Sequence, residues 1–180
     1  MLVAREKRKK NIAEYVLYMW QIEDTLRALQ FDMNLVEERI IPQFRQSGNT
    51  LEEIRDWYTN LIISMIEEGI KTSGHLKIVS SVINELNELH KRLIFENKVP
   101  EYLQVYSHAK PNIDAFREKL QMPGLNEIEV CFYGLYGLLL LRLKKKDVTP
   151  ETVNAMQTFS NILGSLSKYF HDIEQGKAEF

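Results

Sequence analysis

The most constraining feature of this sequence is that apolar residues recur every three or four positions along nearly all of it. The first stretch carries them at Ile12, Tyr15, Val16, Met19, Ile22, Leu26 and Leu29. This spacing places them on one face of an α-helix, because a helix turns once in about 3.6 residues. Later segments show the same period, so the sequence predicts an all-α protein.

Cap and turn residues divide this pattern into about seven helices. We expect helices over 4–29, from Asp32 or Asn34 to Pro42, from Thr50 to Gly69, from Ser80 or Ser81 to about 93, over 100–120, over 126–146 and over 150–171. The clearest starts are Asn126 with Glu129, a capping box, and Thr149 before Pro150. Short connections without a Pro/Gly/Ser-rich linker indicate one domain, 1–180, folded as an antiparallel helical bundle.

The sixth predicted helix, residues 126–146, contains an uninterrupted apolar run from Val130 to Leu141. A membrane-spanning helix needs about 20 such residues, so this run is too short to span a bilayer. Cys131, Gly134 and Gly137 are small residues within it, and they favour close approach of a backbone or a bulky ring. We expect it to be the central buried helix of the bundle, with an oligomer interface as the alternative.

Composition excludes several classes of protein. Eight glycines and five prolines are too few for a sandwich with many tight turns. The formal net charge of −2 argues against a protein built mainly to hold nucleic acid. Cys131 is the single cysteine, and no long apolar segment follows the basic start. We therefore expect a soluble cytoplasmic protein.

Three segments carry a resemblance to a known family. They are REKRKKNIAEYVLYMWQIEDTLRA near the start, EEGIKTSGHL in the middle, and NEIEVCFYGLYGLLLLRLKKK in the second half. Together they resemble a domain-of-unknown-function (DUF) family of Bacteroidetes over almost the whole chain. The resemblance implies one compact all-helical bacterial domain, and it assigns no activity, cofactor or catalytic residue.

The spacings typical of catalytic and metal sites do not occur in this sequence. No histidine follows a glutamate by three positions, as helical di-iron sites require, and no His-Glu-x-x-His or Cys-x-x-Cys occurs. The apolar neighbours of Cys131 should raise its thiol pKa, which disfavours a nucleophile. We expect no cofactor, no metal and no catalytic residue, although an enzyme is not excluded.

The candidate ligand-binding residues are Trp20, Glu23, Asp24, Arg27 and His75. Glu23 and Arg27 are four residues apart, a favourable order for a helical ion pair, and Asp24 lies one turn from Trp20. Charge beside an aromatic ring is typical of a small-molecule pocket. The alternative interpretation is a solvated ion pair next to a core tryptophan.

Histidines offer two further positions. His75 follows Gly74 in a predicted loop, where binding residues are common, but it could equally pack or cap that loop. His90 falls on the apolar side of its helix, so we expect a core-edge residue with one hydrogen bond.

Two basic clusters remain, Arg5–Lys10 at the start and Arg142–Lys146 after the apolar run. Cations at a helix C-terminus complement its dipole, which explains the second cluster without a ligand. Nucleic-acid binding would require both clusters on one face, with exposed aromatic residues for single strands, and it is the weakest hypothesis.

Two hypotheses for function therefore stand above nucleic-acid contact. The first is a non-enzymatic helical protein that acts through self-assembly or partner binding, with aromatic residues as interface anchors. The second is a small polar ligand-binding or enzymatic bundle, with a pocket near Trp20, Asp24, Arg27 and His75.

Overall fold

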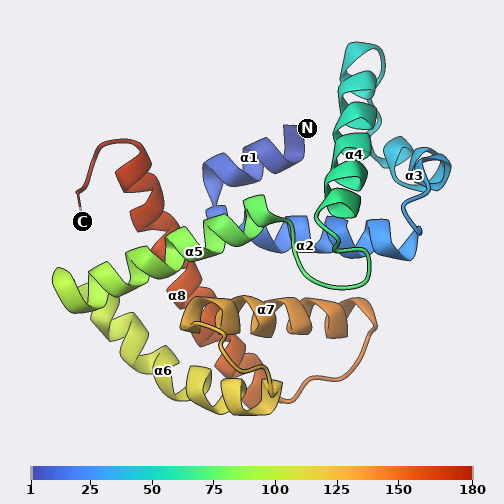
Figure 1. The fold of residues 1–180 in the computed structure, drawn as a ribbon. Helices are drawn as coiled ribbons and strands as arrows, with labels where there is room; N and C mark the ends of the chain where they lie inside the picture. Colours follow the sequence, from blue (N-terminus) through green and yellow to red (C-terminus); the bar gives the residue numbers. More distant parts are fainter. Residues whose placement is uncertain (1, 180) are drawn as a thin grey trace. The chain divides into compact units, whose positions relative to one another are not determined.

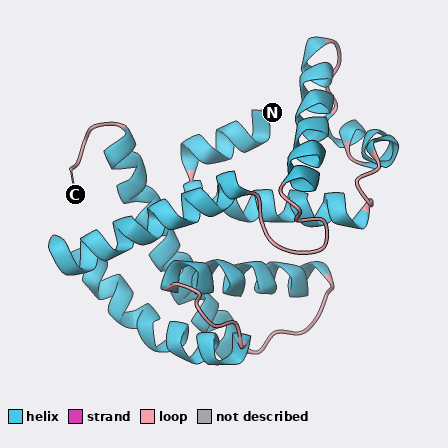
Figure 2. Ribbon diagram, in the orientation of Figure 1, coloured by secondary structure: helices cyan, strands magenta, loops and turns pink. Residues whose placement is uncertain are grey.

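All regular structure in the computed structural model is helical, and the model describes residues 2–179 (Figures 1 and 2). The elements are α1 (Leu2–Lys10), α2 (Ile12–Ala28), α3 (Met33–Arg39), a 3-10 turn (Ile41–Phe44), α4 (Asn49–Glu67), α5 (Lys77–Lys91) with a following π-helical turn (Arg92–Glu96), α6 (Pro100–Leu120), α7 (Glu127–Leu143) and α8 (Pro150–Glu174). The all-α prediction is confirmed, with eight α-helices in these residues instead of about seven.

The additional helix arises from a break at Asn11, within the segment predicted as one helix over 4–29. The Asn11 Oδ1 atom accepts hydrogen bonds from the Ala13 backbone N–H at 3.0 Å and from the Ser167 hydroxyl at 3.0 Å. Asparagine readily caps helices because its side chain competes with the ladder for backbone donors. The prediction of an unbroken first helix is therefore wrong.

The chain forms two compact units. The first comprises the residues up to Lys10 together with Glu14–Ser81, and the second comprises Asn11–Ala13 together with the residues from Val82 onward. The boundary between the units falls inside α5. Cooperative folding of residues 1–180 as a single domain stays a prediction.

In the first unit, α3 packs against α4 and the 3-10 turn. Asp32 caps α3 by accepting the Asn34 N–H at 2.8 Å, and Pro42 lies in the turn that follows the helix. Helix α4 begins at Asn49, after Gly48 with φ 59°, so the predicted cap at Thr50 is wrong. Gly69 has φ 72° and ends the helical segment as predicted.

In the second unit, α6, α7 and α8 pack against one another in every pairing (Figure 1). Pro111 lies within α6, which confirms one helix across this proline. The predicted capping box of α7 is present, with Asn126 and Glu129 exchanging bonds of 2.8 and 2.9 Å. Thr149 caps α8 by accepting the Thr152 N–H at 3.3 Å.

Helix α7 is buried over its first part, but Leu141 and Leu143 are 40% and 58% exposed. Gly134 sits where a Cβ atom would lie 2.7 Å from the Phe159 ring, which confirms the expected close approach of a bulky side chain there. Nothing lies within 4 Å of the corresponding position at Gly137. The central place of residues 126–146 in an antiparallel bundle stays a prediction.

Candidate functional site

The five predicted site residues lie close together in the first unit. Trp20, Glu23, Asp24 and Arg27 project from α2, and His75 belongs to the segment between α4 and α5. Their contacts join α2 to that segment across more than forty residues of sequence. We call this group the Glu23 cluster.

Glu23 is the most buried member of the cluster, with none of its surface exposed. Its Oε2 atom lies 2.6 Å from His75 Nδ1, and its Oε1 atom accepts the Leu76 N–H at 3.0 Å. A buried carboxylate is costly unless donors surround it, and here both oxygens have one. Glu23 is therefore bound to the segment that precedes α5.

The His75 imidazole makes contacts through the face of its ring as well as through Nδ1. Its ring stacks on Trp20 with centroids 4.0 Å apart and planes 9° from parallel. The His75 side chain is 17% exposed, so it is a half-buried group in contact with a fully buried one. The sequence placed these residues in one candidate site but did not indicate this stacking.

Arg27 makes a different ion pair from the one that its spacing predicted. Its partner is Asp24, at 2.8 Å, because Glu23 is turned toward His75. The guanidinium also donates to the Ile70 carbonyl at 3.2 and 3.3 Å, and to the Gly74 carbonyl. Arg27 thus satisfies carbonyl groups that no helix ladder satisfies.

These contacts hold residues 70–76 against α2. The donors and acceptors of Glu23, Arg27 and His75 face one another and the loop backbone, as expected of a packed polar cluster. Glu23 has no exposed surface, so the cluster is an internal polar network and not the solvated Glu23–Arg27 ion pair of the alternative interpretation. Ligand binding by the cluster stays a prediction.

A second buried polar network, in the second unit, was missed by the sequence analysis. His90 is 3% exposed; its Nδ1 atom lies 2.7 Å from the Tyr102 hydroxyl and its Nε2 atom 3.2 Å from a Glu127 oxygen. One hydrogen bond was expected for His90, and the structure has two. The one available signal was the i, i+4 spacing of Tyr102 and Tyr106, which sets both rings on the same face of α6.

The network shifts the acidity of its members. Burial raises the pKa of Glu127, but hydrogen bonds from His90 and Tyr106, with the nearby Lys110 charge, outweigh it and hold that pKa below its ordinary value. Burial raises the phenol pKa values of Tyr102 and Tyr106 well above the ordinary range. His90 therefore sits between a neutral phenol and a carboxylate, with both ring nitrogens engaged.

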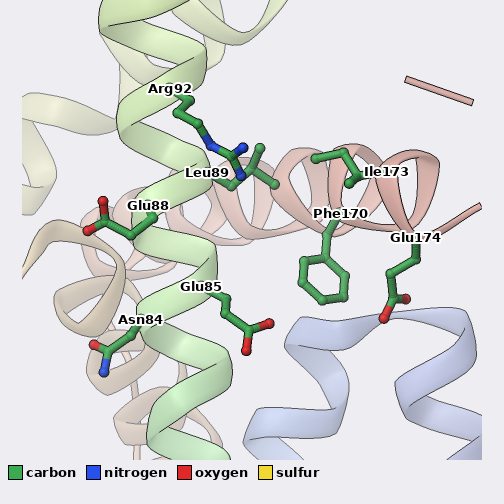
Figure 3. Close-up of a pocket in the computed structure, with 8 residues that line it drawn as sticks. All are labelled: Asn84, Glu85, Glu88, Leu89, Arg92, Phe170, Ile173 and Glu174. Atoms are coloured by element: carbon green, nitrogen blue, oxygen red, sulfur yellow. The ribbon is translucent and has the colours of Figure 1, made fainter. Parts of the chain in front are cut away.

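A cleft of about 490 Å³ lies in the second unit, between α5 and the end of α8 (Figure 3). Apolar side chains that line it include Leu89, Phe170 and Ile173. Figure 3 shows Glu85 reaching from α5 toward the Phe170 ring, with Glu174 on the other side of that ring. None of the five predicted site residues lines this cleft.

Among residues 2–179, no group of three or more His, Cys, Asp or Glu side chains is placed to hold a metal ion. No helix among the described residues has the length and apolar character needed to cross a membrane.

The chain matches the family model described as Domain of unknown function (DUF4924) over residues 1–177. The chain belongs to this family. The match confirms a DUF family over the whole chain, while an origin in Bacteroidetes stays a prediction. No curated protein and no solved structure is significantly similar to the chain. Membership of DUF4924 therefore supplies no activity.

Proposed function

We propose that this protein is a non-enzymatic helical protein that assembles with further copies of itself. The observation that carries the proposal is that both units expose large apolar side chains. Acidic residues border them on one unit, and basic residues border them on the other. One set lies on α4 and the other at the end of α7. Each set is described in turn.

The first set is the α4 strip, which we define as Asp56, Ile63, Ile66 and Glu67. Ile63 and Ile66 are 46% and 41% exposed, although isoleucine is normally buried. Asp56 and Glu67 are exposed as well, and the segment between them contains no lysine or arginine. The strip is thus apolar with an acidic border.

The second set borders the α7 groove, a hollow of about 360 Å³ between α6, α7 and α8. Its walls include Phe116, Gly137, Leu138, Leu141, Lys144 and Met156. The hollow is open beside Gly137, where no atom occupies the space that a Cβ would fill. Beyond it, Arg142 and Lys144–Lys146 set four positive charges against Asp147.

Both surfaces expose apolar side chains and their borders carry opposite charges, which favours a second copy of this chain as the occupant of the groove. Covering a half-exposed isoleucine or leucine gains about 1 kcal/mol, and association costs several, so assembly should depend on concentration. Opposite charges at the borders would set the register and speed encounter. Because strip and groove are different surfaces, the contact is head-to-tail and builds rings or filaments.

A mixing experiment tests this arrangement. Ile66→Glu disables the strip and Leu141→Glu disables the groove, so each variant alone should be monomeric by light scattering. Mixed in equal amounts they should form dimers and nothing larger, because one partner keeps its groove and the other its strip. Ile78→Glu is the matched control, since Ile78 is 60% exposed and belongs to neither surface.

Two results would contradict the proposal. The first is a wild-type protein that stays monomeric up to about 1 mM, where even weak specific contacts are populated. The second is self-association that the mixture of variants fails to restore. Far-UV circular dichroism of each variant separates a lost contact from a lost fold.

The non-enzymatic part of the proposal is supported by the state of the histidines in the two buried networks. His90 has partners at both ring nitrogens, and His75 is bonded to Glu23 and stacked on Trp20. A location in the reducing cytoplasm is supported by Cys131, a buried free thiol. An antiparallel bundle and a bacterial origin in Bacteroidetes complete the proposal as predictions from the sequence.

A further inference from the structure

A small cleft in the first unit brings together part of the basic N-terminal cluster and two aromatic rings. It has a volume of about 230 Å³ and is lined by Ala4, Arg5 and Arg8 from α1, Tyr15 from α2 and Trp57 from α4. Ala4 is buried, and Arg8 follows it by one helical turn, so α1 turns these side chains toward the cleft. We call it the α1 cleft.

The structure shows which charged residues of α1 form ion pairs, and the sequence alone does not. Lys7 is paired with Glu14 at 3.2 Å and Lys10 with Glu6 at 2.6 Å. Glu6 and Glu14 are therefore each engaged by a lysine. Among residues 2–179, no salt bridge involves Arg5 or Arg8, so neither guanidinium of the cleft is paired with a carboxylate.

The aromatic rings are held in place by their neighbours. The Arg8 guanidinium lies 5.7 Å from the centre of the Tyr15 ring. Trp57 is half-buried and stands edge-on to Tyr58, with centroids 4.9 Å apart and planes at 79°. Tyr58 is fully buried, so the indole is fixed on a rigid neighbour while part of its surface faces the cleft.

This combination matches one class of ligand. Guanidinium groups bind phosphate through paired hydrogen bonds, and indole rings stack on nucleobases. The volume is below the usual 300–1,000 Å³ for drug-sized ligands, so it admits a single base with the phosphate at its mouth. We propose that the α1 cleft binds a nucleoside phosphate, with the base against Trp57 and the phosphate on Arg5 and Arg8.

The same chemistry is presented by a free nucleotide and by one residue of a single-stranded nucleic acid. Two probes distinguish these sources: adenosine 5′-monophosphate, and a fluorescent ten-nucleotide single-stranded oligodeoxyadenylate. Tighter binding of the oligonucleotide, with affinity that falls as salt rises, identifies a strand. Equal or weaker binding of the oligonucleotide identifies a free nucleotide. This site does not depend on self-assembly, and titrations at low protein concentration keep the two questions apart.

The decisive comparison uses two variants of α1. Arg5→Ala removes a cleft charge and should weaken binding about tenfold, the usual effect of losing a hydrogen bond to a charged group. Lys9→Ala removes the same charge from an exposed position outside the cleft, and it should change affinity less than about twofold. Arg5 is itself exposed, so its removal should leave the fold intact.

Trp57→Leu tests the base contact and should abolish the difference between adenosine 5′-monophosphate and ribose 5-phosphate. If that variant is unfolded by circular dichroism, the comparison of Arg5→Ala with Lys9→Ala still decides. Three results overturn the proposal: no binding of either probe at low salt, equal losses in the two α1 variants, or equal affinity of the wild type for ribose 5-phosphate and the nucleotide.

Discussion

Glu23 and Asp24 are adjacent carboxylates on α2 that should differ greatly in their contribution to stability. Glu23 has no exposed surface and receives donors from His75 and Leu76, whereas the Asp24 side chain is 46% exposed and contacts Arg27. Replacing Glu23 by alanine leaves two buried donors without an acceptor. Breaking such a buried pair typically costs about 3–5 kcal/mol of unfolding free energy.

Two further substitutions set the scale for this loss. Glu23→Gln keeps the volume and one acceptor oxygen but removes the charge, so it should cost about 1.5–3 kcal/mol. Asp24→Ala removes a partly exposed pair and should cost less than about 1 kcal/mol. The expected order of destabilisation is therefore Asp24→Ala, then Glu23→Gln, then Glu23→Ala.

Urea denaturation followed by far-UV circular dichroism measures these costs, and tryptophan fluorescence adds a local signal because Trp20 stacks on His75. If Glu23→Ala is too unstable to fold, the comparison of Glu23→Gln with Asp24→Ala still ranks the two carboxylates. Equal costs for Glu23→Gln and Asp24→Ala would show that Glu23 does not bind the segment before α5. The inference that the Glu23 cluster holds this segment against α2 would then be refuted.

Three other predictions concern buried or half-buried residues of the second unit. Gly134→Ala should cost about 1–3 kcal/mol more than the control Gly164→Ala in chemical denaturation, because only at Gly134 would the added methyl meet a ring, at 2.7 Å. The lowered pKa of Glu127 means that its stabilising effect is complete above about pH 4.5 and is lost as pH falls through the lower folded value. Glu127→Gln should therefore flatten the loss of urea resistance below pH 4.5, and an unchanged acid limb would count against the His90 network. Burial raises the pKa of the Cys131 thiol, so a disulfide reagent should modify it only after unfolding; rapid labelling of the folded protein would contradict that burial.

Local signals in the sequence predicted local structure well. The capping box at Asn126 and Glu129, the cap at Thr149 and the left-handed Gly69 all use contacts between residues close in sequence. Such contacts depend on short-range geometry, although the same kind of signal at Thr50 misplaced the start of α4. The helix predicted over 100–120 is continuous across Pro111, because the apolar residues keep their helical spacing on both sides of this proline.

For the candidate site, the sequence predicted which residues lie together but not how they pair. Charge next to an aromatic ring identified Trp20, Glu23 and Arg27, but helical spacing gave the wrong partner for Arg27. That partner depends on the Ile70 and Gly74 carbonyls, which no pattern on α2 reveals. A helix-spacing rule assumes that both side chains remain on the helix surface, and here the loop competes for them.

At the start of α5, contacts with distant residues also override a local signal in the sequence. Ser80 or Ser81 was the predicted cap because serine can accept a first-turn amide, yet the helix begins at Lys77. The amides at this start are satisfied from a distance: Leu76 N–H by Glu23 at 3.0 Å and Lys77 N–H by Glu68 at 2.7 Å. A helix whose caps are carboxylates from other elements begins where tertiary packing places those carboxylates. Its first residue should therefore move toward the serines when Glu23 is replaced, as amide hydrogen exchange at Leu76–Val79 would report.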